Sequence, residues 1–267
     1  MIEASFEVGG TRLPLVRSAI IPARFHHGFT TRGGGVSPPP FDSLNLGFKW
    51  GDARDNVLEN RRRVGVATGV ERTFVATQVH GAHVVRVGAG DLVADVAEVE
   101  ADGLISDAAG LAIGVYVADC VPVLMADART GAFAAVHAGW RGTLAGVVPA
   151  AVRRLVAELG VRPGDLRVAL GPAIGVCCFE VGEEVVAAVE QAIPSAAPAG
   201  AIRAGARGRA HVDLKELNRM LLAAEGVPAD AIDAGPECTS CDRARFFSYR
   251  RDHGQTGQAF GFICVKT

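Results

Sequence analysis

Three near-continuous apolar runs follow one another in the middle of the chain, at residues 111–117, 121–126 and 132–136. Runs of this kind are typical of strands that are buried on both faces of a sheet. After the third run two glycines break the pattern, and from Thr143 to Leu159 the apolar residues recur with the i, i+3, i+4, i+7 rhythm of an amphipathic helix that stops at Gly160. The chain must therefore combine buried strands with a helix that packs on them.

Further segments complete the expected architecture. Strands are predicted at residues 73–79, 83–87, 166–170 and 259–265, and helices at 54–67, 182–192 and 214–224, the last capped by Asp213. Strands and helices do not alternate strictly, so we predict an α+β fold in which a mixed β-sheet core is flanked by helices. Without an internal repeat or a linker, residues 1–267 are expected to form a single domain, with a loop at 192–208.

Composition excludes several classes of function. The net charge of −2 supplies no basic field for nucleic acid. No apolar run approaches the roughly 20 residues of a membrane span, and the N-terminus lacks the apolar core of a signal peptide. We therefore expect a cytoplasmic protein with no nucleic-acid, membrane or obligate protein partner. Its six cysteines are too few for a disulfide scaffold in a chain of 267 residues, so reduced thiols are expected.

Three residues with metal-binding atoms stand at the ends of predicted strands. His80 follows the strand-like TFVATQV, Cys120 lies between two apolar runs, and His137 ends the strand AFAAV. Loops converge at strand ends while the sheet holds them rigid. The separations along the chain match no zinc-finger spacing, so a buried thiol with two hydrogen-bonded histidines explains the same pattern.

Two imidazoles and one thiolate are suitable ligands for zinc. Three protein ligands leave the fourth tetrahedral position open, which is the arrangement of a catalytic rather than a structural site. The same three residues also suit copper, because Cu(II) binds a given set of ligands more tightly than Zn(II). The sequence therefore favours a zinc enzyme and leaves copper as an alternative cofactor.

The chain also resembles a known family, the YfiH/YlmD-like purine nucleoside phosphorylases, formerly described as laccase-domain or multicopper polyphenol oxidoreductase proteins. The resemblance runs in order along nearly the whole chain. It is carried by HGFTTRGGGVSPPPFDSLNLG (27–47), QVHGAHVV (78–85), ADGLIS (101–106), ADCVPVLMAD (118–127), VHAGWRGTLAGV (136–147), GPAIGVCCFEVG (171–182), VDL (212–214), CT (238–239) and FFSYRRD (246–252).

The resemblance implies a CNF/YfiH-like layered fold and a metal held by His80, Cys120 and His137. It implies phosphorolysis of adenosine, inosine, guanosine and methylthioadenosine, together with deamination of adenosine. Purine nucleosides and phosphate would then be the partners. Two rival functions follow from the same family, an amidase that edits peptidoglycan precursors and a copper-dependent polyphenol oxidase, or laccase. The second fits poorly because several histidine-rich copper sites would have to come from seven histidines.

Phosphorolysis requires an anion site beside the glycosidic bond. Arg32, followed by three glycines, and Arg141, beside His137 and just before a helix, are the best candidates, because arginine binds phosphate bidentately. Gln78 and Asn45 are candidates for hydrogen bonds to the purine or the ribose. Structural roles explain each equally well: a plain turn for the glycine run, and capping for Gln78 and Asn45. Trp140 is a candidate to stack on a base or to pack in the core.

The remaining cysteines receive no chemical role from the sequence. Cys177-Cys178 is expected to be a packed, inert pair. Cys238-x-x-Cys241 has neither a second CxxC partner nor a thioredoxin-like context. The chain departs from the family pattern at Phe179, where tyrosine is common, and at Gln258, where arginine is common; the latter removes a cation if the position faces the pocket.

Overall fold

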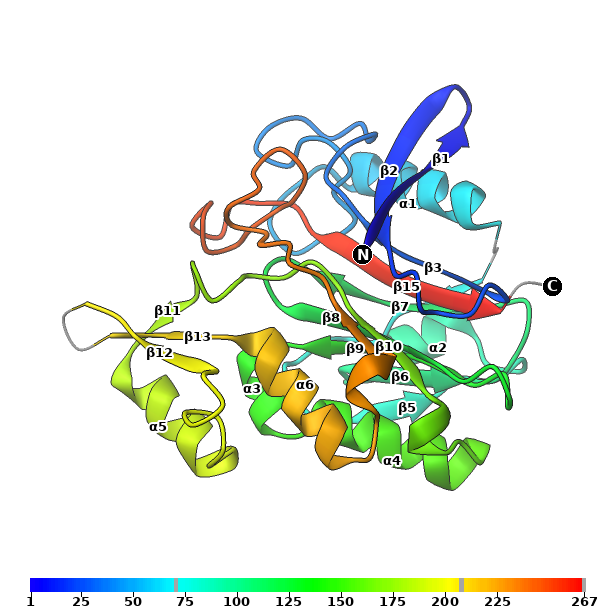
Figure 1. The fold of residues 1–267 in the computed structure, drawn as a ribbon. Helices are drawn as coiled ribbons and strands as arrows, with labels where there is room; N and C mark the ends of the chain where they lie inside the picture. The colour runs from blue at the N-terminus through cyan, green and yellow to red at the C-terminus, as the bar shows by residue number, and fades with distance from the viewer. Residues whose placement is uncertain (70–71, 207–208, 266–267) are drawn as a thin grey trace.

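The computed structural model of the protein describes residues 1–69, 72–206 and 209–265. Two six-stranded sheets pack face to face, and helices cover their outer faces (Figure 1). In spatial order the first sheet contains β1 (Ile2–Val8), β2 (Thr11–Arg17), β3 (Phe25–Thr30), β15 (Ala259–Val265), β7 (Ala112–Val117) and β4 (Thr73–Phe74). The second contains β14 (Ile232–Ala234), β10 (Arg167–Leu170), β8 (Val121–Ala126), β9 (Phe133–Ala138), β6 (Gly103–Ser106) and β5 (Val84–Arg86).

Both large sheets are mixed. Most neighbouring strands are antiparallel, and three pairs, β4 with β7, β10 with β14 and β5 with β6, are parallel. A third, small sheet contains β11 (Glu180–Val181), β13 (Ala210–Val212) and β12 (Ile202–Ala204). The helices are α1 (Arg54–Thr68), α2 (Val93–Ala97), α3 (Trp140–Leu144), α4 (Val147–Leu159), α5 (Glu183–Ala192) and α6 (Leu214–Ala224), with short 3₁₀ turns at Pro163–Asp165 and Ala229–Ala231.

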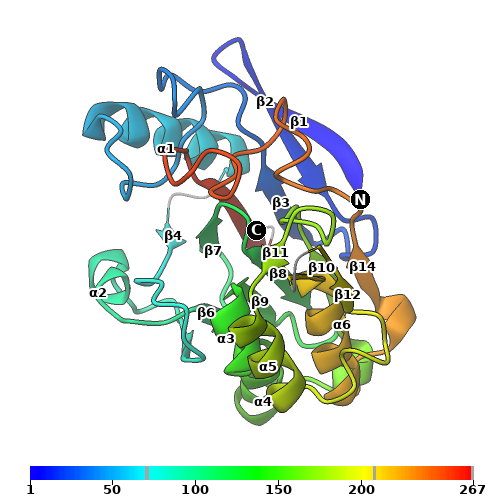
Figure 2. The same ribbon diagram turned by 90° about the vertical axis from the view of Figure 1, so that its left-hand side faces the viewer.

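The helices are divided between the two outer faces. Helix α1 packs on the first sheet, where Val64 joins the apolar cluster that contains Phe260 and Phe262. Helices α4 and α6 cover the second sheet. Figure 2 shows α1 near the β1–β2 hairpin at one end of the molecule and α3, α4, α5 and α6 gathered at the other.

The apolar runs of β8 and β9 are continuous because both faces of these strands are covered. On β8, Val121, Val123 and Met125 pack toward α4 and α6, whereas the alternate residues Leu124 and Ala126 pack toward the first sheet. All six residues of β8 are buried. A strand with one face in solvent would alternate polar and apolar residues instead.

The predicted α+β class is confirmed, with one correction to its arrangement: the core holds two large mixed sheets rather than one. The elements predicted at 54–67, 182–192, 214–224 and 259–265 appear with the same bounds to within one residue, and the Asp213 side chain accepts a hydrogen bond from Glu216 N at 3.0 Å as the helix cap. The N-terminal strands β1, β2 and β3 were not predicted.

Two predicted elements are shorter than expected. The helix expected from Thr143 to Leu159 is divided into α3 and α4 at Gly146, whose φ of 84° is left-handed. The strand expected at 73–79 forms a ladder only at Thr73–Phe74, followed by an isolated bridge between Thr77 and Glu100. Beyond it the side chain of Gln78 bonds the backbone of Tyr116 in β7 in place of a regular ladder.

The loop predicted at 192–208 contains β12, and residues 207–208 lie outside the described residues. Among the helices of the described residues, none has both the length and the apolar character needed to cross a membrane.

Candidate metal centre

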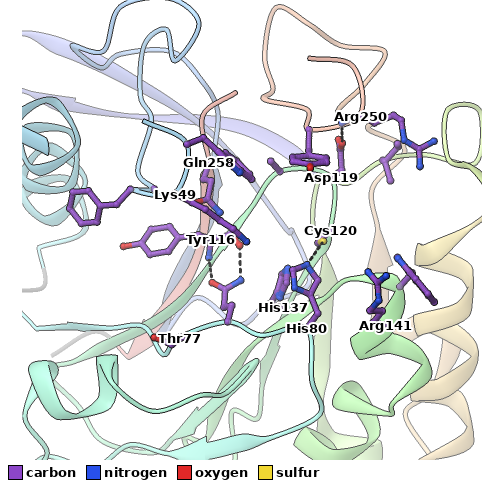
Figure 3. A pocket seen from close by; sticks show the side chains of 18 of the residues that line it. Lys49, Thr77, His80, Tyr116, Asp119, Cys120, His137, Arg141, Arg250 and Gln258 are labelled. Carbon is purple, nitrogen blue, oxygen red and sulfur yellow. Dashed lines mark hydrogen bonds between the residues drawn. The ribbon is translucent and has the colours of Figure 1, made fainter. Parts of the chain in front are cut away.

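His80, Cys120 and His137 meet at one point, as the sequence predicts for a metal site. Their ligand atoms all lie within 4.8 Å of one another, and Cys120 Sγ is 4.0 Å from His80 Nε2 (Figure 3). The two imidazole rings meet edge to face, with centroids 4.8 Å apart. Cys120 lies in the tight turn between β7 and β8, and His137 projects from β9, which pairs with β8. This pairing brings Cys120 close to His137, and His80 comes from the segment between β4 and β5.

The backbone around the trio is unusual at two positions. His80 has a φ of 62° and Asp119, beside Cys120, has a φ of 83°. For residues other than glycine this region costs roughly 1–2 kcal/mol, so surrounding contacts must maintain it. Gly139 packs against both ligand loops, because a Cβ there would lie 2.9 Å from Cys120 Sγ and 2.9 Å from His80 Cδ2.

Asp102 holds the His80 loop and His137 together. Its buried carboxylate accepts hydrogen bonds from the backbone N–H groups of Val79 (3.1 Å), His80 (3.0 Å) and Gly81 (2.7 Å), and His137 Nδ1 lies 2.7 Å from its Oδ1. Burial alone would raise the pKa of Asp102, but these bonds outweigh it and lower the pKa below its usual value. With Nδ1 of His137 engaged, its Nε2 is left to bind a metal.

Asp119 performs the same task for the Cys120 turn. Its carboxylate accepts bonds from Thr239 Oγ1 at 2.6 Å, Ser248 Oγ at 3.0 Å and Arg250 N at 2.7 Å. Burial raises the pKa of Asp119 despite these bonds. The carboxylate therefore fixes the turn rather than reaching toward Cys120.

The trio is electrostatically suited to a metal cation. Burial alone would raise the pKa of Cys120, but the charge of His137 and hydrogen bonds with both histidines lower it to about 6. Burial alone would lower the pKa of His137, but the Cys120 thiolate and the Asp102 carboxylate raise it to about 9. A thiolate is the form of cysteine that binds metals, and a metal cation would displace the proton of His137 from this negatively charged site.

The donor set fits zinc. Zinc ligands at 2.0–2.3 Å in a tetrahedron lie about 3.3–3.8 Å from one another, compared with 4.0 Å between Cys120 Sγ and His80 Nε2. Within the part of the chain that the structure describes, the cluster contains these three residues and no fourth histidine, cysteine or carboxylate. A zinc ion held by these three residues would therefore have no fourth protein ligand among the described residues.

A cavity of about 710 Å³ adjoins the trio. Aromatic rings and cations dominate its walls: the aromatic residues are Phe48, Trp50, Tyr116, Trp140, Phe179 and Tyr249, and the cations are Lys49, Arg61, Arg141 and Arg250. Figure 3 shows Lys49 on one side of the trio and Arg141 on the other. The cavity therefore offers flat apolar surfaces and positive charge beside the three candidate ligands.

The structure places two of the four predicted substrate residues in this cavity. Gln78 lines it, but its Nε2 donates to Tyr116 O and its Oε1 accepts from Tyr116 N, each at 2.8 Å. Arg141 also lines the cavity, with its guanidinium 4.3 Å from the Trp140 ring centroid. Among the described residues Arg141 has no carboxylate partner, so its charge is available to a ligand.

Arg32 and Asn45 lie outside the cavity wall. Arg32 forms an ion pair with Asp42 at 3.0 Å and lies over the ring of Phe247. Asn45 is buried, where it donates to Gly47 O and accepts from Gly47 N and Gln258 N. Gln258 itself lines the cavity, so an arginine at this position would face the same wall.

Several cavity residues were missed by the sequence analysis. Lys49, Arg61 and Arg250 are cations in unremarkable sequence surroundings. Arg61 lies between the rings of Phe48 and Tyr116, at 4.2 and 4.6 Å from their centroids, and burial lowers its pKa. Asp102 was missed too, although its position in the motif ADGLIS, directly before a buried strand, was a usable signal.

The two cysteine pairs require a correction. Cys177-Cys178 is not a packed, inert pair, because Cys177 is exposed. Cys238-x-x-Cys241 does have partners, because the sulfur atoms of Cys177, Cys178, Cys238 and Cys241 all lie within 4.8 Å of one another. The sequence separation of more than 50 residues concealed this cluster.

Comparison with known proteins identifies relatives of this chain in both sequence and fold. The sequence model of the family described as multi-copper polyphenol oxidoreductase laccase matches residues 26–266. A protein from Geobacillus stearothermophilus named purine nucleoside phosphorylase YlmD is 41% identical over 245 residues, which cover 88% of each chain. A purine nucleoside phosphorylase from Pseudomonas aeruginosa is 43% identical over 254 residues, covering 92% of this chain and 95% of the relative.

A solved structure shares the fold. The crystal structure of the hypothetical protein YfiH from Bacillus licheniformis superimposes with a TM-score of 0.89 at 34% identity, covering 98% of this chain and 99% of that chain. The layered arrangement of sheets and helices is therefore that of the YfiH and YlmD proteins.

Proposed function

The chain belongs to the multi-copper polyphenol oxidoreductase laccase family, and from this membership we propose that it is a zinc-dependent purine nucleoside phosphorylase. The proposed substrates are adenosine, inosine, guanosine and methylthioadenosine, with deamination of adenosine as a second activity. The single observation that carries the proposal is the open three-ligand site of His80, Cys120 and His137 beside a cavity of aromatic rings and cations. Relatives named purine nucleoside phosphorylase support it.

The proposed metal is zinc, bound by the thiolate of Cys120 and by the imidazoles of His80 and His137. A zinc ion with an open fourth position supplies a Lewis acid that polarises an oxygen atom. The protein contributes the orientation of the ligands, because Asp102 bonds both His137 and the backbone of the His80 loop. Such outer bonds fix the ring that binds the metal.

The cations of the cavity are proposed to hold phosphate for attack on the anomeric carbon. Arg141 is the leading candidate, because its guanidinium faces the cavity and stacks on Trp140, which limits its motion. Arg250 is tied to the carbonyl oxygen of Glu180 at 2.8 Å and retains donors for an anion. Positive charge fixed in advance stabilises both the nucleophile and the developing charge of the departing base.

The aromatic residues are proposed to bind the purine. Flat rings such as those of Trp50 and Tyr249, whose centroids are 5.5 Å apart, present faces on which a base stacks. Arg61, which contacts the rings of both Phe48 and Tyr116, adds a fixed charge to the cavity. A purine therefore meets apolar surface, and the phosphate meets the guanidinium groups.

A laccase activity is less consistent with the site. Oxidases of the multicopper class need several histidine-rich copper sites. In the described residues one cluster of potential ligands contains histidine, and it contains two.

The direct test is to incubate the purified protein with adenosine, with and without phosphate, and to quantify adenine, hypoxanthine and inosine by chromatography. Phosphate-dependent release of adenine together with inosine formation is expected. Cys120→Ala should lose its metal and at least about 100-fold in activity while remaining folded, because the ligand lies in a turn rather than in the core. Cys264→Ala, which removes a buried thiol from β15, is the matched control.

Two results would refute the proposal: no nucleoside product from the wild-type protein, or equal product from Cys120→Ala. Parallel incubation with a phenolic substrate and oxygen, and with a serine-containing peptidoglycan precursor, tests the oxidase and amidase alternatives. Turnover of either in the absence of nucleoside turnover would replace the proposed function.

A further inference from the structure

A second cluster of metal-binding side chains lies apart from the candidate active site. Cys177 and Cys178 occupy the turn after β10, and Cys238 and Cys241 occupy the segment after β14. From this cluster we propose that the four cysteines bind a second zinc ion, with a structural rather than a catalytic role. This proposal does not depend on the proposed activity.

The distances between the sulfur atoms agree with a shared metal. Cys241 Sγ lies 3.5 Å from Cys177 Sγ and 3.4 Å from Cys178 Sγ, and all four sulfur atoms lie within 4.8 Å of one another. In a tetrahedral zinc–tetrathiolate site, with bonds of about 2.3 Å, the sulfur atoms are about 3.8 Å apart. Cys241 is almost equidistant from two cysteines, which suits one central ion better than one disulfide.

The ligand set defines the kind of site. Four protein thiolates complete the tetrahedron and leave no open position, which is the arrangement of structural zinc. The three-ligand site of Cys120 has the opposite character. The two sites differ in their residues and in their expected coordination, so their metals are separately measurable.

The backbone around the cluster is adapted to sulfur. Gly175 N donates a hydrogen bond to Cys238 Sγ at 3.2 Å. A Cβ on Gly175 would lie 3.2 Å from Cys177 Sγ and 3.1 Å from Cys238 Cβ, so the absence of a side chain there allows the two cysteines to approach. The buried Lys215 donates to the carbonyl oxygen atoms of Gly235 and Glu237 and so fixes the segment directly before Cys238.

The proposed ion would fasten together two segments that build the active-site wall. Ala173 and Cys238 form a β-bridge, and Thr239 N donates to Ala173 O at 3.0 Å. Thr239 bonds the carboxylate of Asp119, which fixes the Cys120 turn. On the other segment, Ile174 and Phe179 line the cavity. Loss of the second ion is therefore expected to lower the stability of the fold and, through these contacts, to disturb the wall of the cavity.

The test measures the metal itself. The protein is purified under reducing conditions with zinc present, and its metals are quantified by mass spectrometry. Two zinc ions per chain are expected in the wild type. One ion is expected in Cys177→Ser/Cys241→Ser, which alters the two exposed cysteines, and one in Cys120→Ala. Cobalt substitution gives a second signature, because the absorption of a tetrathiolate cobalt site should disappear only in the Cys177/Cys241 variant.

Alkylation of the wild-type protein tests the same proposal without any variant. Cys177 and Cys241 are exposed, so iodoacetamide can reach them. Their sulfur atoms should resist the reagent when zinc is bound and react after treatment with a chelator. No change in zinc content in the Cys177/Cys241 variant, or a disulfide among these cysteines in the purified protein, would each overturn the proposal. A single zinc ion in the wild type that persists in Cys120→Ala and is lost from the Cys177/Cys241 variant would support this site and count against zinc at the trio. Iron in place of zinc would overturn the assignment of the metal.

Discussion

His80 and Asp119 show how individual residues sustain the site against a conformational cost. Both have positive φ values, 62° and 83°. Each is held by a buried carboxylate network: Asp102 accepts the N–H group of His80, and the Asp119 side chain is itself bonded by Thr239 and Ser248. Backbone strain of this kind persists where surrounding contacts over-determine it, and it is frequent at functional sites.

Asp102→Asn tests the importance of that network. In this variant an amide NH₂ replaces one carboxylate oxygen of Asp102 and would face partners that are themselves N–H donors. At least one hydrogen bond is therefore lost, and His137 is less well oriented. We expect zinc affinity to fall about 10–100-fold, as measured by competition with a chelator. Asp127→Asn is the matched control, since Asp127 is also buried but bonds Arg129 N and Thr130 away from the trio. Unchanged zinc affinity in Asp102→Asn would contradict the assigned role.

At the scale of elements, the break between α3 and α4 separates a short helix that lines the cavity from a longer helix that packs on the second sheet. Helix α3 carries Trp140 and Arg141 into the cavity, whereas α4 packs on β9, β6 and β5. Gly146 makes the break, because it takes the left-handed conformation that ends one helix and begins the next. The apolar rhythm runs through both helices, so it predicts one helix and conceals the bend.

Gly146→Ala is expected to lower the free energy of unfolding by about 1–2 kcal/mol, because alanine is strained at a φ of 84°. A Cβ at Gly146 would meet no atom within 4 Å, so the cost is conformational rather than steric. Gly65→Ala is the companion variant. It lies inside α1 with open space at its Cβ, and should raise the free energy of unfolding by about 0.5–1 kcal/mol. Urea unfolding measures both; changes of the same sign would refute the argument.

At the scale of the whole molecule, stability depends on the apolar layer between the two large sheets. Phe25 of β3 in the first sheet and Phe133 of β9 in the second meet there, with ring centroids 6.2 Å apart. His27 lies on the same face of β3 as Phe25 and Phe29, because side chains alternate along a strand. It is 2% exposed. A charge on His27 would therefore be buried close to this layer.

This placement predicts a loss of stability in mild acid. Burial, the largest influence, lowers the pKa of His27 from 6.5 to about 4. Between these values the unfolded chain binds a proton that the folded protein does not, so the free energy of unfolding should fall as pH falls below about 6.5. The loss levels off below about 4 and amounts to about 3 kcal/mol.

The measurement is urea unfolding at a series of pH values for wild type, His27→Gln and His83→Gln. His27→Gln should show a shallower decline between pH 6.5 and 4 than the wild type. His83 is exposed, so His83→Gln serves as the control for loss of an imidazole. Parallel curves for wild type and His27→Gln would show that another group causes the acid loss.

The sequence by itself determined the elements that depend on local pattern. The apolar runs of β8 and β9, the strand β15 and the helices α1, α5 and α6 follow from periodicity and capping, because neighbouring residues report which faces of a segment are buried. It also made His80, Cys120 and His137 candidate ligands, since metal-binding side chains at strand ends are conspicuous among apolar residues. The resemblance to the family then favoured a metal site over the alternative of a buried thiol with two hydrogen-bonded histidines.

The tertiary structure decided what depends on contacts between distant segments. It placed Asp102 against His137, brought Arg61 and Arg250 to one cavity, directed Arg32 toward Asp42 instead, and joined two cysteine pairs into one cluster. None of these contacts has a local signature, because a single carboxylate, arginine or cysteine is compatible with many environments. The packing of two sheets and their connecting loops selects one environment for each, and that packing is a property of the whole chain.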